Sequence, residues 1–169
     1  MKEAIQTLLK SDKMVHAFEY LKNDESHTID QQIELVQISS FSPHEEKRAE
    51  RFKELLTEAG LDPVMDEVHN VYAHIHGTGD GPTLYVSAHL DTVFPPETPL
   101  PVKREGTKIY APGIGDDTRG LAEILTLARA IKESGLKPVG DIIIGGNVGE
   151  EGLGDLRGMR HFFSKNADK

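Results

Sequence analysis

The stretch Asp141–Ile144 constrains the fold of this chain more than any other. Its three consecutive isoleucines show no alternation of apolar and polar residues, which is typical of a strand buried on both faces of a sheet. Apolar residues at helical spacing predict a helix before it, between Asp117 and Gly135, and another after it, over Leu156–Lys165. Because strands alternate with helices along the chain, we expect an α/β fold, namely a three-layer α/β/α sandwich with a mixed sheet.

The N-terminal part of the chain predicts helices as well. Residues 1–25 predict one or two short helices, with Ser11 as an N-cap. A further helix is predicted to begin at Thr28, because Thr28–Gln31 has the spacing of a capping box, and to end near Ser39.

The next helix is predicted to begin with Ser42 as N-cap, Pro43 as its first residue and Glu45 reaching back to the cap. Gly60 would end it. Its predicted buried face comprises Ala49, Phe52, Leu55 and Leu56.

Extended segments lie in the middle of the chain. Residues 63–68 and 70–77 predict a strand pair with a turn near His69, and residues 82–86 predict a strand that leads into His89. Residues 102–110 predict a small hairpin around Gly106.

The end of the strand that leads into His89 carries the first candidate site residues. His89 and Asp91 lie two residues apart, on one face, at the end of an α/β strand where ligands bind. Imidazole nitrogen ligates zinc, and a carboxylate beside it can orient the ring. A strand histidine beside a solubilising aspartate is the alternative for this pair taken alone.

Two acidic doublets follow at comparable places. Asp116 and Asp117 come after a glycine-rich loop and open a helix, where only one of them can be the cap. Glu150 and Glu151 follow the buried strand, where adjacent carboxylates repel each other unless a cation or a proton separates their roles. Together with His89 they have the composition of a two-metal hydrolase.

Three other histidines are weaker candidates. His44 is expected to be exposed near a helix start, without an acidic or histidine partner one turn away. His74 and His76 share a face of one predicted strand at a spacing that can hold a metal, but a polar strand face is the preferred explanation, because polar residues alternate in this way on a half-exposed strand.

Composition narrows the chemistry. The 169 residues include no cysteine, which excludes disulfides and thiolate metal ligands and agrees with a cytoplasmic location. The formal net charge of -9 argues against a nucleic-acid partner. No apolar run approaches the roughly 20 residues that span a bilayer, so we expect no membrane partner.

Three motifs follow one another along the chain: His89–Val93, Gly113–Asp117 and Gly149–Gly152. In this order they resemble the dizinc peptidase/deacylase family, which includes peptidase T, carboxypeptidase G, aminoacylase and acetylornithine deacetylase. The similarity extends to Glu34–Ile38 and Gly154–Gly158, so it spans nearly the whole chain. The resemblance implies the phosphorylase/hydrolase-like catalytic domain of a zinc exopeptidase.

The resemblance also implies a set of metal ligands. His89 would ligate one zinc ion, Glu151 the second, and Asp116 would bridge both. In this family a cis peptide often joins the residues that correspond to Asp116 and Asp117. Two Zn²⁺ ions would complete the site, with Co²⁺ or Mn²⁺ as substitutes.

Two further residues would act in catalysis if the resemblance holds. Asp91 would orient His89, and Glu150 would be the general base that takes a proton from water and passes it to the leaving amine. The substrate would be a small peptide or an N-acyl amino acid.

Family members are much longer than this chain. We therefore expect residues 1–169 to be a truncated, N-terminal portion of one catalytic domain, without the lid and dimerisation domain or two further ligands; His161 does not match the family's final histidine ligand. A full-length protein is expected to form a homodimer. The chain alone is expected to bind metal weakly or not at all, to be inactive and to self-associate through an uncovered sheet edge.

Other functions stay open at this stage. A catalytically silent α/β module would work by protein association and merely retain the acidic residues. A Ca²⁺ or Mg²⁺ site would suit the many oxygen ligands, although His89 argues against it because hard cations prefer all-oxygen shells. Between the possible substrates, Gly154–Gly158 favours the peptidase T-like branch by analogy.

Overall fold

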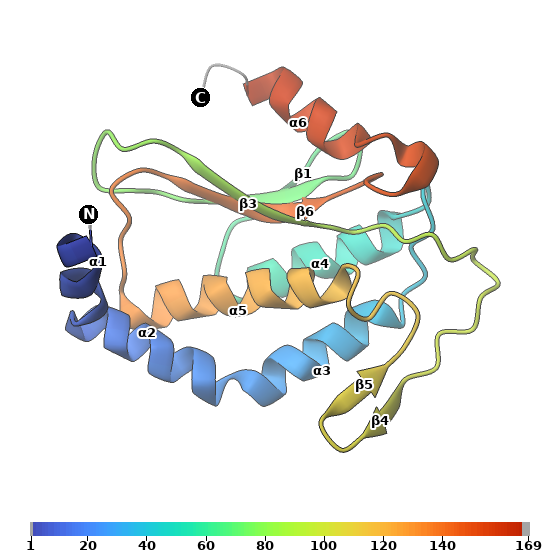
Figure 1. Cartoon of the computed structure of the whole chain (residues 1–169). Coiled ribbons are helices and arrows are strands. Elements are labelled where there is room, and N and C mark those ends of the chain that lie inside the picture. Colours follow the sequence, from blue (N-terminus) through green and yellow to red (C-terminus); the bar gives the residue numbers. More distant parts are fainter. Residues whose placement is uncertain (1, 167–169) are drawn as a thin grey trace.

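The computed structural model describes residues 2–166, so Met1, which the first helical prediction included, and residues 167–169, which the predicted domain included, lie outside the described part. The helices in chain order are α1 Lys2–Leu9, α2 Asp12–Asn23, α3 Glu25–Val36, α4 Glu46–Glu58, α5 Thr118–Ser134, the short 3₁₀ turn η1 Gly152–Gly154 and α6 Arg157–Asn166 (Figure 1). The strands are β1 Val64–Met65, β2 Val71–Ile75, β3 Leu84–His89, β4 Lys103–Glu105, β5 Lys108–Tyr110 and β6 Ile142–Asn147.

The main sheet is mixed, as predicted. Its strand order is β1-β2-β6-β3, and β6 pairs antiparallel with β2 and parallel with β3. Strand β6 is therefore central, in agreement with the buried strand expected at Asp141–Ile144. Strands β4 and β5 form a separate hairpin that turns at Gly106, which has a φ of 59°.

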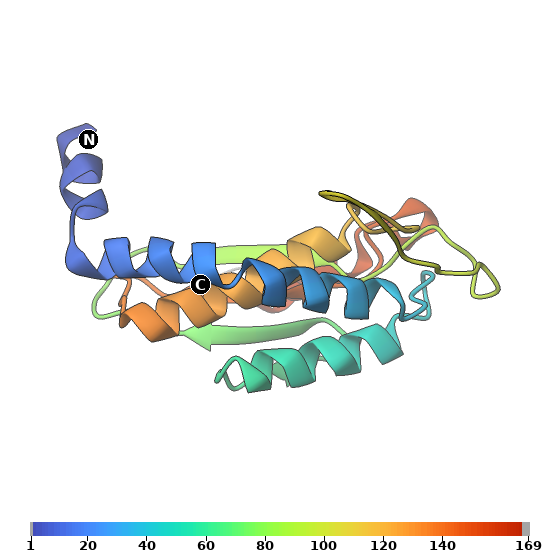
Figure 2. The same cartoon turned by 90° about the horizontal axis from the view of Figure 1, so that it is seen from below.

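Helices cover both faces of this sheet. Helices α4 and α5 pack on one face, α6 lies over the other, and α2 and α3 pack on the outer side of α5 (Figure 1). Figure 2 shows α1 projecting from the body at the start of α2, and α1 buries none of its residues. The three-layer α/β/α fold class is confirmed. Within residues 2–166, no helix combines the length and the apolar character needed to cross a membrane.

The core fills the space between the sheet and α3, α4 and α5. The four residues predicted for the buried face of α4 are at most 1% exposed. The remaining core residues come from all three helices and the sheet, and include Leu35, Val71, Leu90, Leu121, Leu125 and Ile144.

The opposite face of the sheet is covered by aromatic contacts. Phe162 of α6 stacks on Tyr85 of β3 with ring centroids 4.2 Å apart, and meets the edge of Tyr72 of β2 at 5.2 Å. Of the residues on the predicted apolar face of α6, only Phe162 is buried. Leu156 and Phe163 are 46% and 49% exposed, and Met159 is partly exposed. That part of the prediction was too broad.

The prediction that α3 begins at Thr28 was wrong by one turn. The helix begins at Glu25, and the Thr28 hydroxyl donates to the backbone carbonyl of Asp24. Asp24 ends α2 and begins α3, and its carboxylate accepts hydrogen bonds from Thr126 and Arg129 of α5. These contacts with α5 fix the junction between α2 and α3 at Asp24. Helix α3 ends at Val36 and not near Ser39 as predicted.

The predicted start of the next helix was also wrong. Helix α4 begins at Glu46, and Ser42 and Pro43 lie outside it, joined by a cis peptide bond. Glu45 occupies the N-cap position, but its side chain makes no capping hydrogen bond, because Arg157 and the backbone N–H of Gly149 bind its carboxylate instead. The other predicted helix ends, Ser11 at the start of α2 and Gly135 at the end of α5, are confirmed.

Parallel pairing of β3 and β6 determines where functional groups can gather. His89 lies opposite Asn147 in the register, so the carboxyl ends of the two strands meet at one edge of the sheet. The helix start at Thr118 lies beside the same edge, because Asp117 accepts a hydrogen bond from the backbone N–H of His89.

Replacing Asp24 with alanine should destabilise the protein. The side chains of Asp24 and Arg129 are each 10% exposed, and the substitution leaves the guanidinium buried without its charge partner. We expect the free energy of unfolding, measured with urea, to fall by about 2–4 kcal/mol. The control is Asp30→Ala, which removes an exposed aspartate from the same helix and should change stability by less than about 0.5 kcal/mol.

The stabilising effect of Asp24 should also depend on pH. Burial disfavours the charged carboxylate, but the hydrogen bonds from Arg129 and Thr126 outweigh burial and hold the pKa of Asp24 below its ordinary value. The stabilisation is therefore complete above the ordinary aspartate pKa of about 4 and is lost as the pH falls through the lowered value. Equal stability of wild type and Asp24→Ala at pH 7 would contradict this account.

Candidate metal centre

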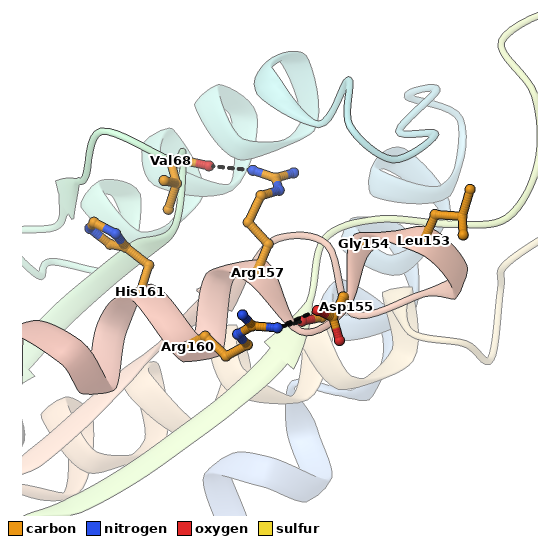
Figure 3. Close-up of a pocket in the computed structure, with 7 residues that line it drawn as sticks. All are labelled: Val68, Leu153, Gly154, Asp155, Arg157, Arg160 and His161. Atoms are coloured by element: carbon orange, nitrogen blue, oxygen red, sulfur yellow. Dashed lines mark hydrogen bonds and ion pairs between the residues drawn. The ribbon is translucent and has the colours of Figure 1, made fainter.

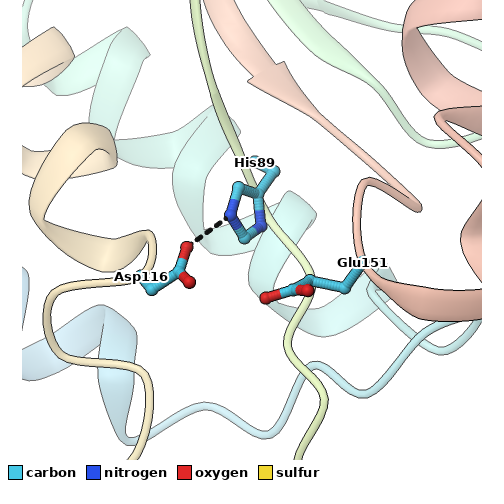
Figure 4. A group of neighbouring side chains, drawn as sticks. All are labelled: His89, Asp116 and Glu151. Atoms are coloured by element: carbon cyan, nitrogen blue, oxygen red, sulfur yellow. Dashed lines mark hydrogen bonds and ion pairs between the residues drawn. The ribbon is translucent and has the colours of Figure 1, made fainter.

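Three side chains from distant parts of the sequence meet at the carboxyl edge of the sheet. One potential ligand atom from each of His89, Asp116 and Glu151 lies within 4.8 Å of the other two (Figure 4). His89 ends β3, Asp116 precedes α5, and Glu151 follows β6. In residues 2–166, this trio is the group of histidine and acidic side chains close enough to hold an ion.

The ring of His89 is fixed through both nitrogens. Nε2 lies 2.9 Å from Oδ1 of Asp116, and Nδ1 lies 3.0 Å from the backbone carbonyl of Asp91. Because both neighbours are acceptors, the geometry favours a ring protonated at both nitrogens. Burial lowers the pKa of His89, but the carboxylates of Asp91 and Asp116 outweigh burial and raise it to about 9. A metal at Nε2 would replace that proton.

Asp91 is completely buried and joins the ends of β3 and β6. Its Oδ1 accepts the backbone N–H of Glu150 at 2.9 Å, and its Oδ2 accepts that of Glu151 at 2.8 Å. Burial disfavours its charge, but hydrogen bonding and the charge of His89 keep its pKa below the ordinary value. The carboxylate lies 3.7 Å from Nδ1 of His89, so the carbonyl of Asp91 makes the shorter contact with the ring.

The two residues of the aspartate doublet make different contacts. Asp117 caps α5 by accepting the backbone N–H of Gly120, and it also accepts the backbone N–H of His89. Burial raises the pKa of Asp117. Asp116, whose side chain is 78% exposed, is free of capping and faces His89. A cis peptide bond joins the two residues.

The two residues of the glutamate doublet also differ in their positions. Glu151 contributes to the trio, whereas Glu150 is exposed and its carboxylate is not part of it. Burial and the negative charge of Asp116 raise the pKa of Glu151. Carboxylates that repel each other in this way are stabilised by a cation between them.

The donor set fits a divalent transition metal. Ligands of one zinc ion each lie about 2 Å from it and therefore within about 4 Å of one another, so small side-chain movements would bring His89 with Asp116, and Asp116 with Glu151, to that geometry. One imidazole nitrogen with two carboxylates suits zinc better than calcium or magnesium.

The other histidines lie elsewhere. His76 is near Asp141 at the far end of β2, and its ring stacks on that of His74. His161 of α6 lies 3.2 Å from Glu67. His44 is exposed. None of these belongs to the trio.

Sequence reasoning missed Arg48, which is 1% exposed. Its guanidinium donates to the carbonyls of Ile38 and Leu90, and the Ser40 hydroxyl donates to Leu90 as well. Burial lowers the pKa of Arg48 to about 10, against the opposing charge of Asp91. These contacts hold the residue between His89 and Asp91 in place. No local pattern distinguishes Arg48 from a solvated helix arginine, because Leu90 lies 42 residues away in sequence.

Comparison with known proteins finds a matching family and similar sequences. Residues 85–169 match the family described as peptidase family M20/M25/M40. Over 142 residues the chain is 30% identical to YqjE of Bacillus subtilis, a protein described as uncharacterized, and the match covers 76% of this chain and 37% of YqjE. Over 84 residues it is 38% identical to carboxypeptidase G2 of a Pseudomonas species, covering 48% of this chain and 20% of that enzyme.

A solved structure is similar to the chain as well. A tripeptidase from Staphylococcus aureus superposes with a TM-score of 0.64 at 32% identity, covering 75% of this chain and 37% of the tripeptidase. The chain thus spans 37% or less of the length of each of these three proteins.

Replacing Asp91 with asparagine should destabilise the edge of the sheet on which the trio lies. Asparagine offers one oxygen acceptor, so its amide group would face a backbone N–H of Glu150 or Glu151. We expect the free energy of unfolding, measured with urea, to fall by about 2–3 kcal/mol. Asp155→Asn is the matched control, because that side chain is 78% exposed and should contribute less than about 0.5 kcal/mol. Equal losses for the two variants would contradict the role assigned to Asp91.

Proposed function

The chain belongs to the peptidase family M20/M25/M40, and from this premise we propose that its site hydrolyses a peptide or acyl-amide bond with two zinc ions. One observation carries the proposal: His89, Asp116 and Glu151 place their ligand atoms within 4.8 Å of one another. Since the chain spans only part of the length of its relatives, the activity is proposed for the whole protein.

In this proposal each side chain has one task. His89 would hold one ion, Glu151 would hold the other, and Asp116 would be shared between them. When bound, the ion pair activates water and polarises the scissile carbonyl. Glu150 accepts the proton of the attacking water on a carboxylate oxygen and delivers it to the leaving amine. Asp91 holds the ring of His89 and the backbone of both glutamates.

The proposal of a small substrate with an apolar side chain is supported by a groove beside the trio. Its volume is about 600 Å³, and it is lined by Glu151 together with Phe41, Pro43, Val93 and Leu153. Leu153 is fully exposed and Val93 is 52% exposed, so both are available to a ligand. Two similar proteins are named a carboxypeptidase and a tripeptidase, which supports a peptide over an N-acyl amino acid.

The remaining parts of the proposal concern metal, location and assembly. Zinc is the proposed metal, with cobalt or manganese as substitutes, because the trio combines nitrogen and oxygen donors. A cytoplasmic location is proposed from the absence of cysteine in the sequence. We also propose that the full-length protein is a homodimer.

A catalytically silent association module is the second candidate. Among the described strands none pairs with the outer edge of β3, and Leu84 on that strand is 56% exposed. Such an edge can pair with another chain, including a second copy of this one. A silent module would not need the His89 ligand atom, so metal binding separates the two candidates.

Zinc binding should depend on the trio. Calorimetric titration of the 169-residue chain with Zn²⁺ should show weak binding, and His89→Ala should weaken it further by at least about 100-fold. The loss of a residue that only orients a ligand costs 10–100-fold, and the loss of a ligand itself should cost more. His76→Ala is the control, since His76 lies outside the trio and is 79% exposed. Equal zinc affinities of wild type and His89→Ala would favour the silent module.

The chain by itself should hydrolyse substrates slowly. Its trio consists of three side chains, whereas two zinc ions with about four ligands each need more protein groups. With added Zn²⁺, turnover of dipeptides, tripeptides and N-acyl amino acids should stay below about 1 s⁻¹, the low end for enzymes. Any residual rate should fall at least about 100-fold in Glu150→Ala while zinc affinity is retained. Fast turnover by the wild-type chain, or residual turnover that survives in Glu150→Ala, would refute these expectations.

A further inference from the structure

Side chains hold an unbroken series of backbone groups at the end of β6. The N–H groups of four consecutive residues, 148–151, donate to side-chain oxygens of other segments: Val148 to Asn70 (3.1 Å), Gly149 to Glu45 (3.1 Å), Glu150 to Asp91 (2.9 Å) and Glu151 to Asp91 (2.8 Å). The three acceptor residues are 0% exposed. Ordinary loops satisfy such groups with water, so this series needs a reason.

Glu45 is the least expected of these acceptors. It immediately precedes α4, where a glutamate is ordinarily solvated, yet its side chain is completely buried. Arg157 donates to both of its oxygens from Nη2, at 2.7 and 2.9 Å. A buried carboxylate is expensive to desolvate unless it is paired and hydrogen-bonded, and the third bond, from Gly149, completes that requirement.

Arg157 extends the same connection to other segments. Its Nη1 donates to the carbonyl of Val68 at 3.1 Å, and Figure 3 shows this guanidinium pointing to Val68 and away from Arg160, which bonds Asp155 instead. Its backbone N–H donates to the carbonyl of Gly149 at 3.1 Å. Arg157 therefore binds the backbone of Gly149 directly, through its own N–H, and indirectly, through the carboxylate of Glu45.

Gly149 is fitted to this contact. Its φ is +62°, and a Cβ at this position would lie 3.1 Å from both Cβ and Nε of Arg157. A side chain here would push Arg157 away. The close approach fixes the backbone one residue before Glu150.

From these contacts we propose that Glu45 and Arg157 are positioning residues for the Glu150–Glu151 doublet. Asp91 holds the doublet from the β3 side, and the Glu45–Arg157 pair holds the residue before it from the side of α4 and α6. The inference rests on the proposed function, because it takes Glu151 as a metal ligand. With the pair intact, Glu151 meets His89 and Asp116 without further ordering of the backbone.

A role in stability alone would predict different behaviour. Asp24 and Arg129 form a second buried ion pair, on the part of α5 that lies about 16 Å along the helix from its start beside the site. Breaking either pair should lower the melting temperature. Only the Glu45–Arg157 pair should change the backbone at residues 150–151 and the metal affinity.

The experiment compares two matched sets of variants of the 169-residue chain. Glu45→Gln and Arg157→Lys weaken the pair that holds Gly149, while Asp24→Asn and Arg129→Lys weaken the remote pair in the same chemical ways. The first readout is amide hydrogen exchange by NMR at Glu150 and Glu151, relative to the core amide of Ile144. The second is the affinity for Zn²⁺ measured by calorimetry.

We expect exchange at Glu150 and Glu151 to accelerate about tenfold or more, relative to Ile144, in Glu45→Gln and Arg157→Lys. Zinc affinity in these variants should fall roughly 10–100-fold, as for other partners outside the ligand set. Asp24→Asn and Arg129→Lys should lose comparable thermal stability while keeping the wild-type exchange ratio and zinc affinity.

The outcomes separate this inference from the proposed function. Unchanged relative exchange at residues 150–151 in the folded variants overturns the inference, whether or not the chain binds zinc. So does unchanged zinc affinity when wild type binds zinc and His89→Ala does not. Zinc binding that is indifferent to His89 overturns the proposed function, and the exchange data then decide the inference alone. If Glu45→Gln fails to fold, Arg157→Lys, which keeps the buried charge pair, provides both readouts.

Discussion

The hydrogen bonds from the backbone of Glu150 and Glu151 to the buried carboxylate of Asp91 are the contact on which the site depends. Parallel pairing brings the carboxyl ends of β3 and β6 to one edge of the sheet, but pairing alone would leave the residues beyond each strand without a fixed position. Asp91 lies just beyond the first strand and binds the residues just beyond the second. The potential ligand atoms of His89 and Glu151 are therefore brought together by hydrogen bonds to the backbone rather than by attraction between these two side chains.

This arrangement explains how the protein tolerates an acidic cluster. Asp116 and Glu151 approach each other closely enough that the negative charge of Asp116 adds to burial in raising the pKa of Glu151. Repulsion of this kind would separate side chains on mobile loops. Here Asp117 holds the first doublet through His89 and Gly120, and Asp91 holds the second. A divalent cation would relieve the repulsion without requiring the backbone to move, which is the property expected of a prepared metal site.

Much of the fold and of the candidate site could be predicted from the sequence. The features that could not be predicted depend on contacts between residues far apart in the chain. The buried strand around Ile143 and the α4 core face follow from local periodicity. The rule that ligands bind at strand ends predicts that His89 and the acidic doublets gather at one sheet edge, whereas the choice of Asp116 and Glu151 within the doublets is what the family resemblance implies. The start of α3 and the role of Glu45 follow from none of these, because each is decided by a partner about a hundred residues away: Arg129 is 105 residues from Asp24, and Arg157 is 112 from Glu45. These buried charge pairs, and not the local capping signals, determine where α3 begins and what Glu45 binds.

The carboxyl edge of this sheet is proposed to be a zinc site. The most direct test of this proposal is anomalous X-ray diffraction at the zinc absorption edge from crystals of the chain grown with Zn²⁺. The proposal predicts anomalous density at one or both of two positions, between Nε2 of His89 and the carboxylate of Asp116 and between the carboxylates of Asp116 and Glu151, with metal–ligand distances of about 2.0–2.2 Å. Zinc bound only at surface sites, with the hydrogen bond between His89 and Asp116 retained, would contradict it.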